Sequence, residues 1–119
     1  MNIEEPINPE KLIFPWKNTA NDISFGHSSS NRCGLNIKFY KCANYTLYAE
    51  FTARPEYQNF PGVVHGGVVA AALDECMGQS TYIKSGFLSV STKMETEWLK
   101  PTPANVRLAI YVNTDKISR

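Results

Sequence analysis

Residues 66–82 constrain the fold of this chain more than any other part of the sequence. The segment is apolar, lacks alternation, and carries only two charged side chains, Asp74 and Glu75. At about 100° per residue, as in an α-helix, apolar residues and one histidine share a side. These are His65, Val68, Val69, Ala72, Leu73 and Cys76. Because Lys84-Ser85-Gly86 follows, the pattern predicts one long helix from Gly66 to about Tyr82 with an apolar stripe.

The segments around this helix alternate between apolar and polar residues, which is typical of strands with one buried face. Four such strands are predicted, over residues 35–40, 47–53, 87–99 and 106–112. In the third, we expect one side to carry Val90, Thr92, Met94, Thr96 and Trp98, and the other to carry Ser91, Lys93, Glu95 and Glu97. The sequence therefore predicts an α+β fold, with one helix laid against the dry face of an antiparallel sheet.

The first 30 residues show no sustained period and contain three prolines. We therefore expect an irregular N-terminal arm over 1–30 and one globular domain over 31–119. The run Lys11-Leu12-Ile13-Phe14 and the nearby Trp16 are apolar enough to pack this arm onto the domain.

Charge and cysteine content exclude several classes of protein. Twelve Lys and Arg against eleven Asp and Glu give a net charge of +1, which argues against a protein whose main task is holding nucleic acid. No stretch approaches the roughly 18 apolar residues of a membrane span, and the first residues do not form a secretory signal. Cys33, Cys42 and Cys76 show no paired spacing. We expect reduced thiols and a cytoplasmic protein.

Asp74 is the first chemical feature, because it lies about 180° from the apolar stripe. Its neighbours on that side are small: Gly67, Ala70, Ala71 and Gly78. Small residues let a second backbone approach closely, and a partly desolvated acid acquires an adjustable proton affinity. A surface acid on an alanine-rich helix has the same pattern, so both interpretations stay open.

The start of the helix is the second chemical feature. The run Gly62-Val63-Val64-His65-Gly66-Gly67 leaves backbone N–H groups free at a positive helix end, which can hold the oxyanion of an acyl-transfer step. A tight turn with a core histidine is the alternative. From Gly66 to Asp74 is about 12 Å of helix rise, so one reacting carbon cannot contact both. Either the two groups do not form one site, or a second copy of the chain supplies the missing half. A two-fold dimer with antiparallel helices would bring one helix start beside the other's middle.

The stretch Glu56-Tyr57-Gln58-Asn59-Phe60-Pro61-Gly62-Val63-Val64-His65-Gly66-Gly67, continued by Val68-Val69-Ala70-Ala71-Ala72-Leu73-Asp74-Glu75, resembles a known family. It is similar to the hotdog-fold acyl-CoA thioesterases, specifically the phenylacetate-degradation and 4-hydroxybenzoyl-CoA thioesterase-like group. Residues 91–94 and 98–101 resemble that family's next strand. Residues 24–27 and 31–35 resemble its upstream motif, with Ser24 and His27 where cysteines are usual. The likeness covers about residues 24 to 112.

The resemblance implies a hotdog fold, in which a curved antiparallel sheet wraps around the central helix. It also implies a homodimer or dimer of dimers that hydrolyses an acyl-CoA thioester at the subunit interface, without metal or cofactor, in lipid metabolism. Asp74 would be the general base or the nucleophile, and Gly66 and His65 would polarise the carbonyl. Asn59 and Thr92 would lie near the attacking water, although a loop amide and a plain strand residue are the alternatives. Gly67, Gln58 and Val64 are the expected substrate contacts. Glu75 is interpreted as structural, and Lys93, Lys100 and Arg107 as cations for the CoA phosphates.

Chains of this family usually continue with further long strands, which would take about 15–25 residues beyond Arg119. The sheet is therefore expected to have an open edge over the helix, as in a fragment, a truncated product or a shortened variant. Three alternatives to the thioesterase remain: a module that binds acyl-CoA without turnover, an inactive partner of another hotdog chain, and a hydratase or dehydratase. The hydratase is the weakest, because its usual motif places Asp and His a few residues apart.

Overall fold

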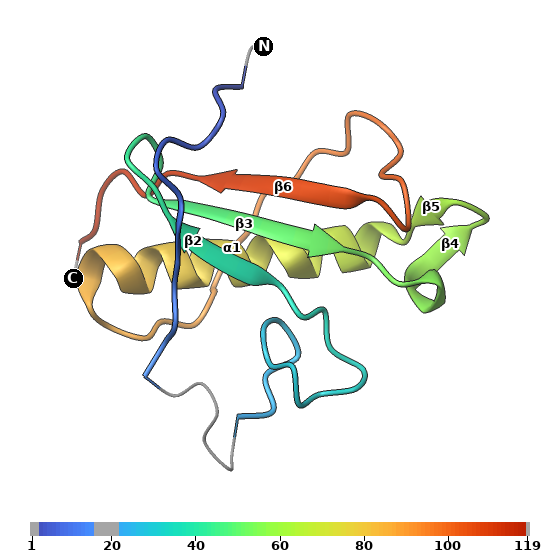
Figure 1. The fold of residues 1–119 in the computed structure, drawn as a ribbon, viewed down its shortest axis with the longest axis horizontal. Coiled ribbons are helices and arrows are strands. Elements are labelled where there is room, and N and C mark those ends of the chain that lie inside the picture. The colour runs from blue at the N-terminus through green and yellow to red at the C-terminus, as the bar shows by residue number, and fades with distance from the viewer. Residues whose placement is uncertain (1–2, 16–21, 119) are drawn as a thin grey trace.

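The computed structural model describes residues 3–15 and 22–118 and has a single α-helix, α1 (Gly66–Ser85), among those residues. Figure 1 shows α1 running along a sheet whose strand order is β1-β2-β3-β6, with every neighbouring pair antiparallel. The strands are β1 (Glu10–Lys11), β2 (Lys38–Lys41), β3 (Leu47–Thr52) and β6 (Arg107–Val112). The predicted α+β architecture, with one helix packed on an antiparallel sheet, is confirmed.

A short hairpin leads into the helix. The 3-10 turn η1 (Pro55–Tyr57) is followed by β4 (Gln58–Phe60) and β5 (Val63–Val64), which form a separate two-stranded sheet. Gly62 makes the turn between them with a φ of 82°, a left-handed conformation that glycine adopts without strain. The N–H of His65 donates to the carbonyl of Tyr57 at 2.8 Å, which fixes the direction in which α1 begins.

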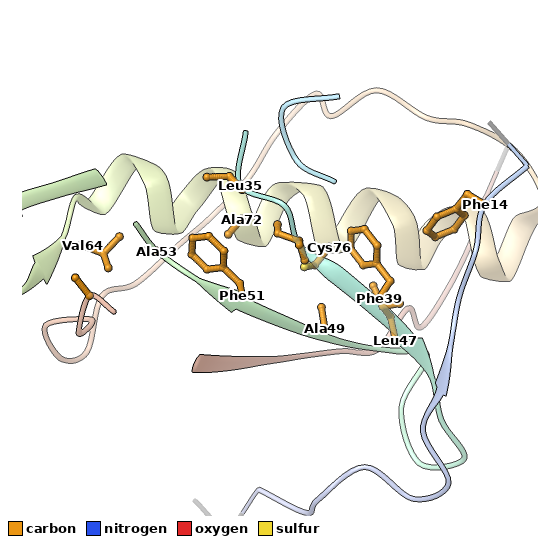
Figure 2. Close-up of a cluster of buried hydrophobic side chains, with 12 residues drawn as sticks. Phe14, Leu35, Phe39, Leu47, Ala49, Phe51, Ala53, Val64, Ala72 and Cys76 are labelled. Atoms are coloured by element: carbon orange, nitrogen blue, oxygen red, sulfur yellow. The ribbon is translucent and has the colours of Figure 1, made fainter. Parts of the chain in front are cut away.

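The core lies between α1 and the inner face of the sheet. Figure 2 shows Phe51, Ala49 and Leu47 of β3 in one cluster with Ala72 and Cys76 of α1. Ala72, Cys76 and Ser80 are the buried residues of the helix. They are spaced four apart, so they form one narrow stripe of small side chains along which the helix approaches the sheet closely.

This stripe differs in part from the prediction. Ala72 and Cys76 are buried, and Val68 and Val69 are partly buried against the core, as expected. The placement of His65 on the core side is wrong: its side chain is exposed, because it caps the helix rather than continuing the stripe. The helix also runs one turn further than expected and ends at Gly86, whose φ of 79° and N–H bond to Tyr82 close its last turn.

The predicted strand over residues 87–99 is wrong. Those residues form no strand, and Val90 is 89% exposed. The segment returns along α1, where Ser91 contacts Asp74 and Trp98 contacts Gly66. Alternation fixes which way side chains point, but a strand also needs a neighbouring backbone to pair with, and a helix surface offers none.

The N-terminal arm is less irregular than expected. β1 pairs with β2, placing Glu10 opposite Lys41, and Phe14 is buried in the core against Phe39 and Tyr82. Trp16, which we also expected to pack, lies outside the described residues. The other three strand predictions are confirmed as β2, β3 and β6, with β2 beginning three residues later than expected. No helix in the described ranges has the length and apolarity to cross a bilayer.

Thiol labelling tests this core. Cys33 is exposed, whereas Cys76 is buried and burial raises its pKa to about 12, so almost no thiolate forms at neutral pH. A soluble disulfide reagent is expected to modify Cys33 quickly and Cys76 only after denaturant unfolds the chain, with a Cys33→Ser variant as the control for site assignment. Equal labelling rates for Cys33 and Cys76 in the native protein would contradict the core described above.

Candidate functional site

The first turn of α1 is closed by His65. The N–H of Gly67 donates to Nδ1 of His65 at 2.9 Å, and the N–H groups of Val68 and Val69 donate to its carbonyl at 3.0 and 3.2 Å. Since Nδ1 accepts a hydrogen bond, the neutral ring carries its proton on Nε2. In the part of the chain that is described, the N–H of Gly66 donates to no protein group. The helix start therefore offers one backbone N–H and one ring N–H at a positive helix end.

Trp98 covers one side of this turn. Its Nε1 donates to the carbonyl of Gly66 at 3.3 Å, and a Cβ on Gly66 would lie 3.4 Å from the same nitrogen. A Cβ on Gly67 would lie only 3.0 Å from Nδ1 of His65. A Cβ at Gly67 would therefore crowd the capping ring of His65, whereas a Cβ at Gly66 would make an ordinary contact with Trp98.

The hairpin before the helix holds three of the predicted site residues. Gln58 donates from Nε2 to the carbonyl of Pro55 at 3.0 Å and accepts from the N–H of Gly62, so both ends of its amide brace the loop. Val64 is buried in the core. Asn59 is exposed, and its amide has no hydrogen-bond partner among the described residues. Of the three, only Asn59 presents a free polar group.

Asp74 lies near the middle of α1, in a cavity of about 370 Å³. The cavity is lined by Asp74, Glu75, Gly78 and Gln79 of the helix and by residues 88–91 of the returning segment. The hydroxyl of Ser91 donates to Oδ1 of Asp74 at 2.5 Å. Asp74 is half-buried rather than freely solvated, because residues 88–91 of the returning segment cover this part of the helix face.

Ser91 is a site residue that the sequence interpretation missed. The expected strand put Ser91 and Thr92 on opposite sides, and the family resemblance placed Thr92 near the attacking water. In the structure Thr92 is exposed, and the hydroxyl that reaches the carboxylate belongs to Ser91. A strand's two-fold parity does not apply to a segment that pairs with no strand. The adjacent hydroxyls in Ser91-Thr92 were the available signal.

The structure does not bring the two chemical features together within one chain. Gly66 and Asp74 lie on the same straight element, separated by about 12 Å of helix rise. Asn59 lies in the hairpin before the helix and His65 caps its first turn, whereas Ser91 of the returning segment contacts its middle. A single chain therefore has a carboxylate cavity at one place and a hydrogen-bond donor end at another.

Beside the cavity, Glu75 joins α1 to the N-terminal part of the chain. Its Oε1 lies 2.8 Å from Nδ1 of the buried His27 and accepts from Nε2 of Gln79 at 3.0 Å. Asp22 lies 3.6 Å from the other ring nitrogen of His27. Gly26 packs so closely that a Cβ there would collide with the carboxyl group of Glu75. The interpretation of Glu75 as structural agrees with these contacts, and His27 is its previously unassigned partner.

The electrostatics of Glu75 reflect two opposing effects. Burial raises its pKa, but the hydrogen bonds from His27 and Gln79, with the charge of His27, outweigh burial and leave the pKa below its ordinary value. The amide oxygen Oε1 of Gln79 is a hydrogen-bond acceptor that is buried without a partner among the described residues. The cavity wall therefore carries the carboxylate of Glu75 and, one helical turn further on, the unpaired amide oxygen of Gln79.

The described residues include no group of three or more His, Cys, Asp or Glu side chains that is arranged to hold a metal ion. Comparison of the chain with protein-family models, with curated proteins and with solved structures finds no match. The fold and the cavity beside Asp74 are therefore the features that bear on the class of this protein.

The contact between Glu75 and His27 predicts a pH-dependent stability. Because the pKa of Glu75 is lowered on folding, its ionised form stabilises the native state above the unfolded pKa, and this contribution is lost as the pH falls through the folded pKa. Glu75→Gln is expected to lower the denaturation midpoint at pH 7, and the gap to the parent is expected to narrow below about pH 4. The exposed Glu95→Gln is the matched control. A gap that is the same at pH 7 and pH 3 would contradict the assignment.

Proposed function

We propose that this chain is a hotdog-fold thioesterase, which hydrolyses an acyl-CoA thioester to a free acid and CoA and works as a homodimer. The observation that carries the proposal is the Asp74 carboxylate, held by the hydroxyl of Ser91 in a cavity on the helix face turned away from the core. The architecture of one helix on an antiparallel sheet is compatible with the hotdog arrangement.

The cavity supplies the carboxylate of Asp74, which acts as the general base or the nucleophile. A carboxylate that accepts one hydrogen bond from Ser91 keeps its second oxygen for a water molecule. As a general base, Asp74 takes a proton from that water while the oxygen attacks the thioester carbon. As a nucleophile, it forms an acyl-carboxylate anhydride that water then hydrolyses. Both routes expel CoA as a thiolate, which takes up a proton, and both use the same carboxylate in the same place.

In the proposed dimer, the start of α1 in the second copy supplies the hydrogen-bond donors that polarise the thioester carbonyl. The N–H of Gly66 and the Nε2–H of His65 are donors at the positive end of a helix, where a developing oxyanion is stabilised. Because they lie about 12 Å from Asp74 along one helix, the proposal assigns them to the second copy, whose α1 would run antiparallel beside the first.

The exposed returning segment supports a dimer. Leu88, Val90 and Leu99 are 75%, 89% and 84% exposed, and Trp98 is 54% exposed. They lie in two pairs near the ends of residues 88–99, which form no strand. Exposed apolar side chains gathered at such places are unfavourable in water and are expected to be covered by a partner.

The first test is free-thiol release from a panel of aliphatic and aromatic acyl-CoAs. Asp74→Asn keeps the shape of the side chain and removes its basicity, so the rate is expected to fall by about 10²–10⁴-fold. Asp115→Asn is the matched control, because Asp115 is exposed and lies outside the cavity. A rate in Asp74→Asn equal to that of the control would reject Asp74 as the catalytic group. Saturable acyl-CoA binding without thiol release in the parent would instead indicate a binding module.

The second test asks whether two chains share each site. His65→Asn keeps a side chain that caps helices well but removes the imidazole, so it is expected to fold and to lose activity. When it is unfolded and refolded with an equal amount of Asp74→Asn, half of the dimers are hybrids, each with one intact and one doubly altered site. About a quarter of the parental activity is then expected. If hybrid dimers form and no activity returns, each site lies within one chain.

A further inference from the structure

The outer face of the sheet, turned away from α1, is organised into an aromatic half and a basic half. Strand register places Tyr48 of β3 opposite Tyr40 of β2 and Tyr111 of β6. Two residues further along β3, Glu50 lies opposite Lys38 and Ala109. Residues two apart on a strand share a face, so all six side chains are on the outer face.

The basic half is hollowed into a groove of about 310 Å³. Four cations line it, from four different parts of the chain: Arg32, Lys38, Arg54 and Arg107. Glu50 is the one carboxylate among the lining residues. The groove lies between the outer face of the sheet and the loop that precedes β2, and it belongs neither to the Asp74 cavity nor to the helix start.

Two of the groove cations are already positioned by neighbours. Nη2 of Arg54 donates to the hydroxyl of Tyr57 at 2.8 Å, and Nε of Arg54 lies 3.7 Å from Glu56. The hydroxyl of Tyr57 in turn bonds the carbonyl of Gly34 at 3.0 Å, so Arg54 is tied to the loop that forms the opposite wall. Nη1 of Arg107 lies 3.4 Å from Oε2 of Glu50.

The other two cations, Arg32 and Lys38, make no ion pair with any described residue. The groove therefore gathers four positive charges around one negative charge, although the whole chain is nearly neutral at +1. Outside the lining there are eight basic and ten acidic residues. The positive charge of this chain is thus concentrated in a single small groove, whose cations repel each other until an anion enters.

The aromatic half continues directly from the groove. The ring centroid of Tyr48 lies 5.5 Å from that of Tyr40 and 5.4 Å from that of Tyr111. Between Tyr111 and Arg107 on β6 stands Ala109, whose small side chain leaves space over the sheet. A flat ring can lie over this space, against the tyrosines, while attached phosphates reach the cations.

We propose that the outer face binds a nucleoside phosphate, with its phosphates among Arg107, Lys38 and Arg32 and its base over Ala109 against Tyr48. Guanidinium groups match phosphate oxygens in pairs, which favours phosphate over a single carboxylate. The volume suits a small ligand, and the net negative charge of the rest of the chain disfavours a longer nucleic acid. A free nucleotide and the nucleotide end of CoA share this chemistry.

The test is calorimetric titration of the full chain with ADP, pyrophosphate, adenosine, CoA and a short single-stranded oligonucleotide. ADP is expected to bind more tightly than pyrophosphate or adenosine, because only ADP uses both halves of the face. CoA binding with an affinity like that of ADP would identify the nucleotide end of a CoA ester as the natural ligand, and ADP binding without CoA binding would identify a free nucleotide. Tighter binding of the oligonucleotide than of ADP, or no saturable binding of ADP, would overturn the proposal.

Variants locate the site without relying on loss of function alone. Arg107→Gln and Lys38→Gln are each expected to weaken ADP binding by about tenfold or more, whereas the exposed Lys116→Gln is the matched control. Glu50→Gln removes the one carboxylate of the groove and is expected to tighten ADP binding several-fold, a gain that misfolding cannot produce. Tyr48→Leu is expected to weaken ADP and leave pyrophosphate unchanged.

Asp74→Asn should leave ADP binding unchanged, which separates this proposal from the proposed hydrolysis. An equal loss in Lys116→Gln and Arg107→Gln, or weaker binding in Glu50→Gln, would place the ligand elsewhere and reject the groove.

Discussion

The close approach of α1 to the inner face of the sheet is the contact on which the rest of the structure depends. It is made possible by small side chains four residues apart, Ala72, Cys76 and Ser80, which lie against the larger residues of β3. Because the helix is held along this line, its first turn faces the β4–β5 hairpin and its middle presents Asp74 on the opposite side. A larger residue at Ala72 or Cys76 would push the helix outward and displace both its first turn and Asp74.

This contact also leaves two separate surfaces, the far side of α1 and the outer face of the sheet, which carry different functional groups. The far side of α1 has a carboxylate and a hydroxyl in a cavity, whereas the outer face of the sheet has tyrosines and guanidinium groups. Neither set is needed to hold the core, which is formed by apolar residues between the two layers. The proposed hydrolysis and the proposed nucleotide binding therefore draw on separate side chains and can succeed or fail independently.

The sequence predicted the elements whose signal is local. Alternation located β3 and β6, and the apolar run with its flanking glycines located α1. The prediction failed over 87–99, because pairing depends on a neighbouring backbone that no local pattern reveals. The family resemblance placed Thr92 near the attacking water, whereas the hydroxyl that contacts Asp74 belongs to Ser91. His65 was placed on the core side by helical periodicity, which stops being valid at a capping residue. The contact of His27 with Glu75 joins residues 48 apart in the sequence and lies beyond any local pattern.

The pairing of β3 with β6 has a consequence for how the chain folds. It joins Leu47 to Val112 and Thr52 to Arg107, so a loop of more than fifty residues must close before the largest strand pair can form. The helix and the β4–β5 hairpin lie inside that loop and need only local contacts. As the chain leaves the ribosome, they are free to form early, while β3 has only β2 beside it. Until β6 is synthesised, one edge of β3 has no neighbouring strand, and an unpaired strand edge favours association with other chains.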